Sequence, residues 1–278
     1  MIALVTDSNA MLPDNLRTRF GVEVVALTVV VDGEAFAEGV DLITADFYAR
    51  LDAGASVSTA APSPGAFLEA YERAAGRGAT AVLSVHIGSN TSATLDSARL
   101  AAHEAAIPVE LVDTGTASFP VACCVWAAGL ALERGSGLDE AAAAARAVAE
   151  QVGNVFVVGA ADLARRGGRL RQGAEAGEGL TVVALRAGTM EIVGNADDVD
   201  AAAKSMDEEF ARAAQHRRMR VGVGDAAAAE LADALVVRLR RRAEVVDLVR
   251  YAVGPSVAAH TGLGTAGAVY FPAELTEL

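Results

Sequence analysis

The sequence predicts an α/β protein with two domains, each a largely parallel sheet flanked by helices. Short runs rich in Val and Ile alternate with longer segments in which apolar residues recur at helical spacing, as in proteins that pack helices on parallel strands. The chain has 278 residues, which is enough for two domains of ordinary size. Hydrophobic residues make up 53% of it and aromatic residues only 5%, so Ala, Val and Leu must fill most of the core.

The first half of the chain alternates between predicted strands and helices. Strands are expected at 2–6, 22–31, 81–87 and 109–113, and helices at 65–78 and 93–106. Asp32-Gly33 follows an apolar run and is a strong hairpin signal, which predicts one antiparallel excursion. Residues 120–132 are almost entirely apolar but too few to span a bilayer, so they predict a buried helix.

The Ala-rich segment 138–154 marks the predicted domain boundary. Asp139 and Glu140 favour the start of a helix there, and Gly153-Asn154 are expected to end it. Residues 1–152 then form the first α/β domain and residues 153–278 the second. In the second domain we expect strands at 155–159, 220–224 and 245–253, a hairpin at 180–194, and helices at 197–215 and 227–243.

The charge balance excludes one broad class of partner. A formal net charge of −13 repels phosphate backbones, so we expect no general binding of nucleic acid. Positive charge is nevertheless concentrated at 216–220 and 238–242. These clusters are typical of a solvated helix face, and the alternative is a contact with an acidic partner or an anionic membrane surface.

The two cysteines and the amino-terminal stretch bear on the compartment. Cys123 and Cys124 are adjacent, which fits neither a disulfide framework nor a zinc site, and we expect both to be small core residues. No metal site is predicted. The stretch 1–10 resembles a strand and lacks the charged start of a secretory signal, so a cytoplasmic protein is expected.

The stretch 89–94 concentrates neutral hydrogen-bonding side chains where a predicted strand gives way to a helix. Ligands of open α/β sheets bind beyond the carboxyl ends of strands, and helix N-termini present unpaired N–H groups to anions. Capping the helix would use one or two of the hydroxyls, and the others, among Ser89, Ser92 and Thr94, favour a site for a carboxylate or a phosphate. The alternative is that all of them serve local capping.

Two other junctions carry weaker signals. Asp7, Ser8 and Asn9 follow the first strand and are best interpreted as helix-capping residues. Thr59 precedes a loop made rigid by prolines, with Ser63 or Pro64 opening the next helix, and this rigid bend makes it a candidate to face the same crevice.

The glycine-rich segment near the C-terminus spells GxGxxG through Gly262, Gly264 and Gly267. A dinucleotide site needs a helix after these glycines, whereas a strand is predicted, so nucleotide binding is not expected. His260 immediately precedes this loop. Together with Ser92 and an Asp it would suit a Ser-His hydrolase or acyl-transfer enzyme, although no G-x-S-x-G elbow surrounds Ser92.

An arginine-rich turn lies in the second half, at 163–173. Four arginines, Arg166 and Arg169 among them, surround Gly167-Gly168. The segment predicts either a surface turn that ends a helix or a contact for a phosphate or an acidic partner.

Six segments, in this order, resemble the DegV family, whose fatty-acid-binding members are called FakB. They are VTDSNAMLP, STAAPSPGAF, HIGSNTSATLDSA, VDTGTASFP, LARRGGRL and HTGLGTAG. The chain departs from the family pattern at Thr91, where Leu is usual, at Ala93, where Gly is usual, and at Leu263, where Pro is frequent.

The resemblance implies two α/β domains with a long-chain fatty acid in an apolar tunnel in the cleft between them. By the same resemblance, Thr59, Ser92 and His260 bind the carboxylate of the fatty acid. The residues implied beside them are Ser89, Ala93, Thr94, Thr261 and Gly262.

The resemblance also implies a carrier without catalysis of its own and without a cofactor. FakB-like members present the carboxylate to an ATP-dependent fatty acid kinase, FakA, for phospholipid synthesis in bacteria. Arg166, Arg169 and the basic clusters are then candidates for contact with the kinase or, transiently, with a membrane surface.

Overall fold

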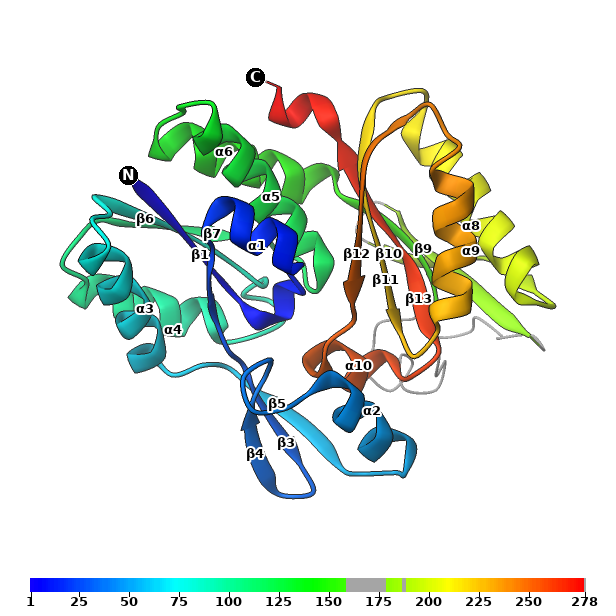
Figure 1. Cartoon of the computed structure of the whole chain (residues 1–278), viewed down its shortest axis with the longest axis horizontal. Helices are drawn as coiled ribbons and strands as arrows, with labels where there is room; N and C mark the ends of the chain where they lie inside the picture. Colours follow the sequence, from blue (N-terminus) through cyan, green and yellow to red (C-terminus); the bar gives the residue numbers. More distant parts are fainter. Residues whose placement is uncertain (159–178, 187–188, 278) are drawn as a thin grey trace. The chain divides into compact units, whose positions relative to one another are not determined.

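The computed structural model describes residues 1–158, 179–186 and 189–277 (Figure 1). The predicted arginine-rich turn, with Arg166 and Arg169, lies outside these residues. The chain divides into two compact units, of which the first contains Met1–Thr44, Ser56–Gln151 and Glu274–Leu278 and the second contains Ala45–Ala55 and Val152–Ala273. Both units are discontinuous in sequence, whereas the sequence predicts two contiguous ranges. Ala45–Ala55 belongs to the second unit, and Glu274–Leu278 belongs to the first.

The first unit is built on a parallel sheet with strand order β2-β1-β6-β7. Its strands are β1 (Ile2–Asp7), β2 (Glu23–Val25), β6 (Ala81–His86) and β7 (Val109–Asp113). Its helices are η1 (Ser8–Ala10), α1 (Asp14–Phe20), α3 (Pro64–Gly76), α4 (Thr94–Glu104), α5 (Phe119–Glu133) and α6 (Leu138–Gln151). Helices α3 and α4 pack together on one face of the sheet, and α5 and α6 pack together on the other. The α/β class and the parallel sheet of this unit are confirmed.

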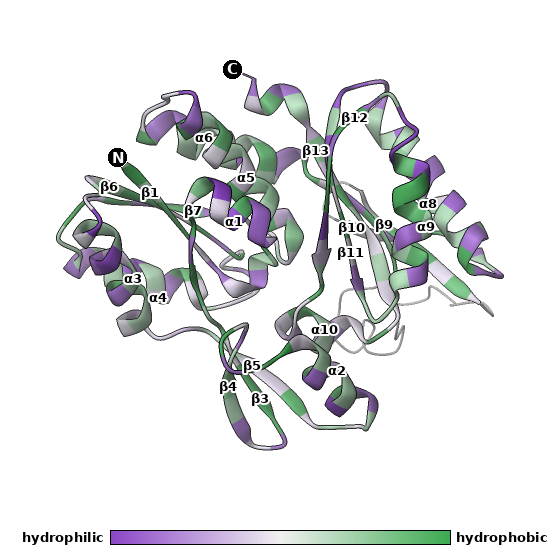
Figure 2. Ribbon diagram, in the orientation of Figure 1, coloured by the Kyte–Doolittle hydropathy of each residue, from purple (hydrophilic) through white to green (hydrophobic). Residues whose placement is uncertain are grey.

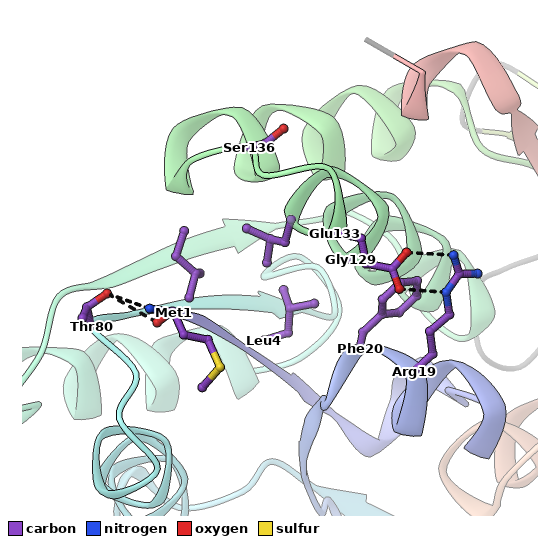
Figure 3. A pocket seen from close by; sticks show the side chains of 10 residues that line it. Met1, Leu4, Arg19, Phe20, Thr80, Gly129, Glu133 and Ser136 are labelled. Carbon is purple, nitrogen blue, oxygen red and sulfur yellow. Dashed lines mark hydrogen bonds and ion pairs between the residues drawn. The ribbon is translucent and has the colours of Figure 1, made fainter.

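Helix α5 is the buried helix that the sequence predicts. It is apolar on all sides in Figure 2, whereas α3 carries polar residues along one side. Cys123 and Cys124 are buried in it, as expected of core residues. On its outer side the ring of Phe20 from α1 lies against Gly129, where a Cβ would stand only 2.5 Å from the ring (Figure 3).

A small antiparallel sheet extends from the first unit. It joins β3 (Thr28–Val31), β4 (Glu34–Ala37) and β5 (Val57–Ala60). Asp32 and Gly33, with φ of 50° and 87°, form the predicted hairpin turn between β3 and β4. The apolar run 22–31, predicted as one strand, is divided between β2 and β3, because the chain turns at Leu27, whose N–H donates to Ser8 Oγ at 2.9 Å.

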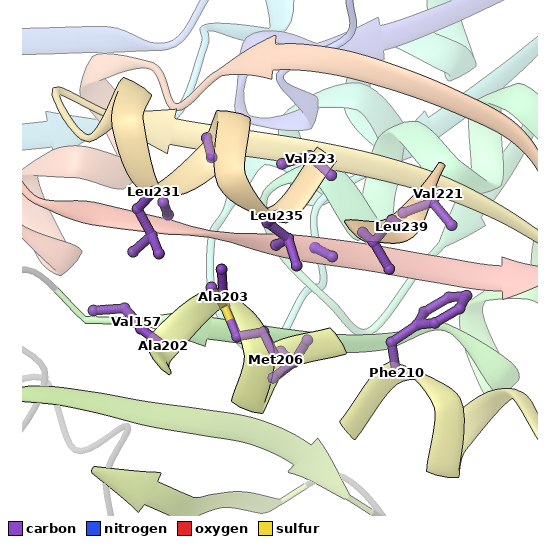
Figure 4. Packing of buried hydrophobic residues seen from close by; sticks show 14 of the residues in the cluster. Val157, Ala202, Ala203, Met206, Phe210, Val221, Val223, Leu231, Leu235 and Leu239 are labelled. Atoms are coloured by element: carbon purple, nitrogen blue, oxygen red, sulfur yellow. The ribbon is translucent and has the colours of Figure 1, made fainter. Parts of the chain in front are cut away.

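The second unit contains a six-stranded sheet, as far as the described residues extend, with order β10-β9-β8-β13-β11-β12. The strands are β8 (Gly153–Val157), β9 (Leu180–Arg186), β10 (Thr189–Ala196), β11 (Met219–Ala226), β12 (Val245–Ala252) and β13 (Thr265–Pro272). The helices are α2 (Thr44–Asp52), whose first residue falls in the first unit, α8 (Val199–Ala214), α9 (Ala229–Leu239) and α10 (Pro255–Thr261). The short helix η2 (Ala273–Thr276) begins at the last residue of this unit and lies mostly in the first. Helices α8 and α9 cover one face and pack Met206 and Phe210 against Leu231, Leu235 and Leu239 (Figure 4).

Two details of the second domain differ from the prediction, whereas the antiparallel pair β9–β10 confirms the hairpin predicted at 180–194. Only β11 and β12 are parallel, and the remaining neighbours are antiparallel, unlike the prediction, because β13 enters the sheet between β8 and β11 and β8 pairs antiparallel with β9. Gly153 and Asn154 do not end the preceding helix, which stops at Gln151, but begin β8. Gly153 is needed there because a Cβ would stand 2.5 Å from the ring of Tyr270 on β13.

Candidate functional site

The carboxyl ends of β1, β6 and β7 meet at one edge of the parallel sheet, where α/β proteins place their ligands. Asp7 ends β1, His86 ends β6 and Asp113 ends β7. The side chains of Asp7 and Asp113 hold neighbouring loops by hydrogen bonds, and that of His86 contacts Asp7. The loop that carries Ser92 begins directly after His86.

Asp7 connects β1 to the loop after β6. Its side chain is completely buried. Oδ1 accepts a hydrogen bond from Asn9 N at 3.1 Å, which confirms Asp7 as the N-cap of η1. Oδ2 accepts a bond from Ile87 N at 3.1 Å and lies 2.9 Å from His86 Nδ1. The carboxylate thus ties the start of the Ser92 loop to the end of β1.

His86 continues this arrangement into the core. Its Nε2 lies 2.6 Å from Ser84 Oγ, which in turn lies 3.0 Å from the hydroxyl of Tyr71 on α3. The ring of Phe67 packs edge-on against the imidazole with centroids 5.0 Å apart. Burial raises the pKa of Tyr71 to about 12, against a smaller opposing effect of its bond to Ser84, so the phenol keeps its proton.

The contacts thus link a serine, a histidine and an aspartate, in the order Ser84, His86, Asp7. They do not include Ser92 or His260, the two residues of the alternative hydrolase. All three side chains are completely buried, so no substrate reaches Ser84. The contacts hold the end of the sheet together and do not form an exposed nucleophile.

Ser89 joins the β6 loop to the β7 loop. Its Oγ donates to Asp113 Oδ2 at 2.5 Å, and its N–H donates to Oδ1 at 3.1 Å. Gly115 N donates to the same carboxylate at 3.0 Å. Desolvation acts to raise the pKa of Asp113, but these hydrogen bonds and the charge of Arg99 outweigh it and lower the pKa. Ser89 thus joins two loops, and the place beside the ligand that the family resemblance implies for it stays a prediction.

Ser92 begins the turn into α4. Its Oγ lies 2.8 Å from Thr94 Oγ1 and accepts a bond from Thr94 N at 3.3 Å. Ala93 occupies the N-cap position and is exposed, whereas Thr94 is completely buried. Ser92 is half-buried, so its hydroxyl combines a local capping role with access from outside.

Thr59 lies on β5, opposite Val29 of β3, and is half-buried. The loop after it opens α3 as predicted: Ser63 Oγ accepts a bond from Ala66 N at 3.2 Å, and Pro64 is the first helical residue. Thr59 and Ser92 both belong to the first unit.

His260 belongs to the second unit and lies in the last turn of the short helix α10, where it is exposed. Thr261 Oγ1 donates to Val257 O at 3.3 Å, and Gly262 ends the helix with a φ of 79°. The strand predicted after the glycines is present as β13. Gly267 lies within it because a Cβ would stand 2.2 Å from that of Phe156, so this glycine serves strand packing.

The loop after β7 contains backbone strain. Ser118 has φ 66° and ψ −152°, a region that residues other than glycine rarely adopt. Its N–H donates to Asn9 Oδ1 at 2.7 Å, so the loops after β1 and β7 are also joined. A non-local hydrogen bond therefore accompanies the strained conformation at the edge of the candidate site.

A groove at the opposite end of the same sheet is lined by apolar side chains and an ion pair (Figure 3). Of its lining residues, Met1 precedes β1, Ile2 begins it, and Thr80 precedes β6. The groove therefore lies at the amino ends of these strands. Arg19 and Glu133 close one side through a 2.8 Å contact. None of the predicted site residues lines it.

The basic clusters of the second unit are partly neutralised by ion pairs. Arg238, in α9, contacts Asp200, in α8, at 2.6 Å. Arg242, which follows α9, contacts Asp207, in α8, at 2.6 Å. Arg220 pairs with Asp247 across β11 and β12. Much of this positive charge thus belongs to the packing of the unit itself.

The described ranges contain neither a candidate metal site nor a candidate membrane span. No group of three or more His, Cys, Asp or Glu side chains in these ranges is arranged to hold a metal ion. Across the same residues, none of the helices combines the length and the apolar character needed to cross a membrane.

The sequence did not single out His86, Ser84 or Asp113 as residues of this region. A signal was present: Ser84 and His86 alternate within an otherwise apolar strand, so both point to the same face of the sheet. Their partners come from β1 and α3, and only the folded chain brings these together.

Comparison with known proteins gives consistent results along the whole chain. The sequence profile of the DegV family matches residues 1–273. A DegV domain-containing protein of Streptomyces coelicolor is 36% identical over 273 residues, which cover 96% of this chain and 97% of that protein. A fatty-acid-binding DegV family protein from Thermus thermophilus has 31% identity and a TM-score of 0.83, over 98% of this chain and 99% of the other.

A DegV lipid-binding protein from Thermotoga maritima shares the fold with a TM-score of 0.86 and 24% identity, over 98% of both chains. The two-domain α/β architecture is thus that of solved DegV structures, and the family suggested by the six sequence segments is confirmed. The chain belongs to the DegV family.

Proposed function

We propose that this protein binds a long-chain fatty acid and that Thr59, Ser92 and His260 hold its carboxylate. The observation that carries the proposal is the likeness, over nearly the full length and at 31% identity, to a fatty-acid-binding family member. Ser92 suits the role because it is half-buried at a helix start, where a hydroxyl and free N–H groups favour an anion.

The neighbouring residues of the proposed site divide into two groups. Ala93 is exposed at the N-cap of α4, so its backbone is open to a headgroup. Thr94 supports Ser92 from a buried position, and Ser89 supports the loop through Asp113. In the second unit, Thr261 and Gly262 end α10 next to His260.

Affinity in this proposal comes mainly from the acyl chain. Burying roughly 14 methylene groups contributes on the order of 11 kcal/mol before ordering costs. A hydrogen bond to a charged carboxylate contributes only about 1.5 to 3 kcal/mol. Removing one hydroxyl should therefore weaken and misdirect binding without abolishing it.

The carrier in this proposal presents the carboxylate to a FakA-like fatty acid kinase for phospholipid synthesis and performs no reaction itself. Hydroxyls and an imidazole, in place of a strong Arg or Lys pair, leave the carboxylate available to a second protein. Arg166 and Arg169, outside the described residues, are the proposed contact for that kinase, and a transient membrane contact belongs to the same proposal.

Titration of detergent-free, delipidated protein with oleate tests the proposal. Wild type should bind one oleate, and Ser92→Ala should weaken binding by about tenfold, the loss of one hydrogen bond to a charged group. Ser136→Ala is the matched control, because Ser136 is equally half-buried but lines the groove at the other end of the sheet. Equal affinities for wild type and Ser92→Ala would contradict the role of Ser92.

An esterase assay on the same proteins separates the carrier from the alternative enzyme. A carrier shows no hydrolysis of a p-nitrophenyl acyl ester above background in wild type. Hydrolysis that disappears in both Ser92→Ala and His260→Ala would establish the hydrolase instead.

A further inference from the structure

We propose that Asp7 and His86 are positioning residues for Ser92: their buried pair sets the course of the loop from which Ser92 meets its ligand. The ligand-binding part of this inference rests on the proposed function. The structural part concerns the loop alone and is tested without ligand.

The first step of the argument is the connection from Asp7 to Ser92. Asp7 Oδ2 accepts the N–H of Ile87, the first residue of the loop. The next residue, Gly88, accepts two hydrogen bonds at its carbonyl, from Thr91 N at 2.9 Å and from Ser92 N at 3.1 Å. Ser92 is therefore attached to a tight turn whose entrance is held by the Asp7 carboxylate.

The second step is the lack of free space around that turn. Gly88 N donates to Thr116 O at 2.7 Å, and a Cβ on Gly88 would stand 2.7 Å from the backbone carbon of Gly115. The loop is thus pressed against the β7 loop on one side and bonded to Asp7 on the other. A change at Asp7 transmits to Ser92 because the intervening turn is tightly constrained.

The third step explains why His86 is needed. A completely buried carboxylate is costly unless donors surround it. Asn9 N and Ile87 N supply two donors, and His86 Nδ1 at 2.9 Å supplies the third. Without the third donor, the buried Asp7 carboxylate would lack one of its hydrogen bonds and would shift toward water, which loosens its hold on Ile87.

The fourth step concerns the orientation of the imidazole. His86 Nδ1 lies 2.9 Å from Asp7 Oδ2, and because a carboxylate oxygen only accepts, Nδ1 carries a proton and donates to Asp7. On the other side of the ring, Nε2 lies 2.6 Å from Ser84 Oγ, which lies 3.0 Å from the hydroxyl of Tyr71 on α3. The bond at Nδ1 is therefore the one contact of the ring that reaches Asp7, and the contact at Nε2 is distal to it.

Two amide substitutions at His86 separate positioning from general core packing. In His86→Asn the side-chain amide takes the place of Nδ1 and retains a donor to Asp7. In His86→Gln it takes the place of Nε2, so the bond to Ser84 is kept and the bond to Asp7 is lost. Ser84→Ala removes the distal contact alone, and Asp7→Asn removes the charge that organises all three donors.

Hydrogen–deuterium exchange of the ligand-free protein is the first measurement. We expect the amides of 87–92 to exchange about tenfold faster in His86→Gln and Asp7→Asn, and close to the wild-type rate in His86→Asn and Ser84→Ala. Equal acceleration in His86→Asn and His86→Gln, or wild-type rates in both, would overturn the proposal. This pair decides the question even if Asp7→Asn does not fold.

The second measurement compares oleate with oleyl alcohol, which shares the chain but lacks the carboxylate. His86→Gln should weaken oleate binding about tenfold and alcohol binding less than about twofold, with His86→Asn restoring oleate binding. A purely structural role would weaken both ligands alike and contradict the positioning of Ser92. If wild type binds neither ligand, the proposed function is wrong. The exchange rates of the ligand-free protein still test whether Asp7 and His86 hold the loop.

Discussion

Ser89 Oγ donates a 2.5 Å hydrogen bond to Asp113 Oδ2, and this contact joins the loops after β6 and β7 at the edge of the candidate site. The same carboxylate also accepts two backbone N–H bonds. The strength of these contacts depends on the charge of Asp113, because bonds to an ionised carboxylate are stronger than neutral ones.

Stability should depend on pH through Asp113. Its hydrogen bonds place the pKa of the folded state below that of the unfolded state, so the stabilisation is complete above the unfolded pKa and is lost as pH falls through the folded pKa. Ser89→Ala should cost about 1 kcal/mol near neutral pH, and the cost should shrink as pH falls below the ordinary pKa of Asp, about 3.9. Denaturant unfolding at a series of pH values measures it.

The matched control for this prediction is Thr91→Ala. Thr91 lies in the same loop and is exposed, and its hydroxyl donates to the neighbouring side chain of Asn90, so removal should change stability by less than about 0.5 kcal/mol at any pH. A pH-independent cost for Ser89→Ala, equal to that of Thr91→Ala, would show that Asp113 is not the source.

Replacing Ser118 with glycine should stabilise the protein. The φ of 66° and ψ of −152° cost of order 1–3 kcal/mol for a residue with a Cβ, whereas the added freedom of glycine in the unfolded chain costs about 1 kcal/mol. We expect a net gain of about 1 kcal/mol by denaturant unfolding. Ser118→Ala keeps the Cβ and the strain, so it should show no gain.

Gly88→Ala should destabilise the Ser92 loop. The new methyl group would overlap the backbone of Gly115 at 2.7–2.8 Å, and backbone cannot move aside as a side-chain end can. We expect a loss of about 1–3 kcal/mol, with weaker oleate binding. Gly76→Ala is the control, since nothing lies within 4 Å of its added Cβ, and it should be neutral or slightly stabilising.

The sequence predicted the class of the fold and the edge of the sheet where polar groups gather, because strand and helix periods and capping residues are local signals. It did not predict that the run 22–31 divides into two strands. That break depends on Ser8, which accepts the N–H of Leu27 across 19 residues of chain. Nor does an apolar run tell whether a buried strand is parallel, so the second sheet was assigned the wrong direction at most of its pairs.

Within the candidate site, the sequence identified the cluster of hydroxyl side chains at 89–94 but not the different contacts that each hydroxyl makes. Ser89 and Ser92 are alike in sequence, yet Ser89 is engaged by Asp113, which comes from a different strand. Thr94 is similar in type but completely buried. The division of roles depends on contacts between strands that a single sequence does not encode locally.

Native mass spectrometry of protein purified without detergent, followed by solvent extraction of any released lipid, tests fatty acid binding most directly. We predict a mass one fatty acid above that of the polypeptide, and an extract in which that fatty acid is identified. A mass equal to the bare polypeptide, unchanged after incubation with saturated and unsaturated fatty acids, would contradict the proposed function.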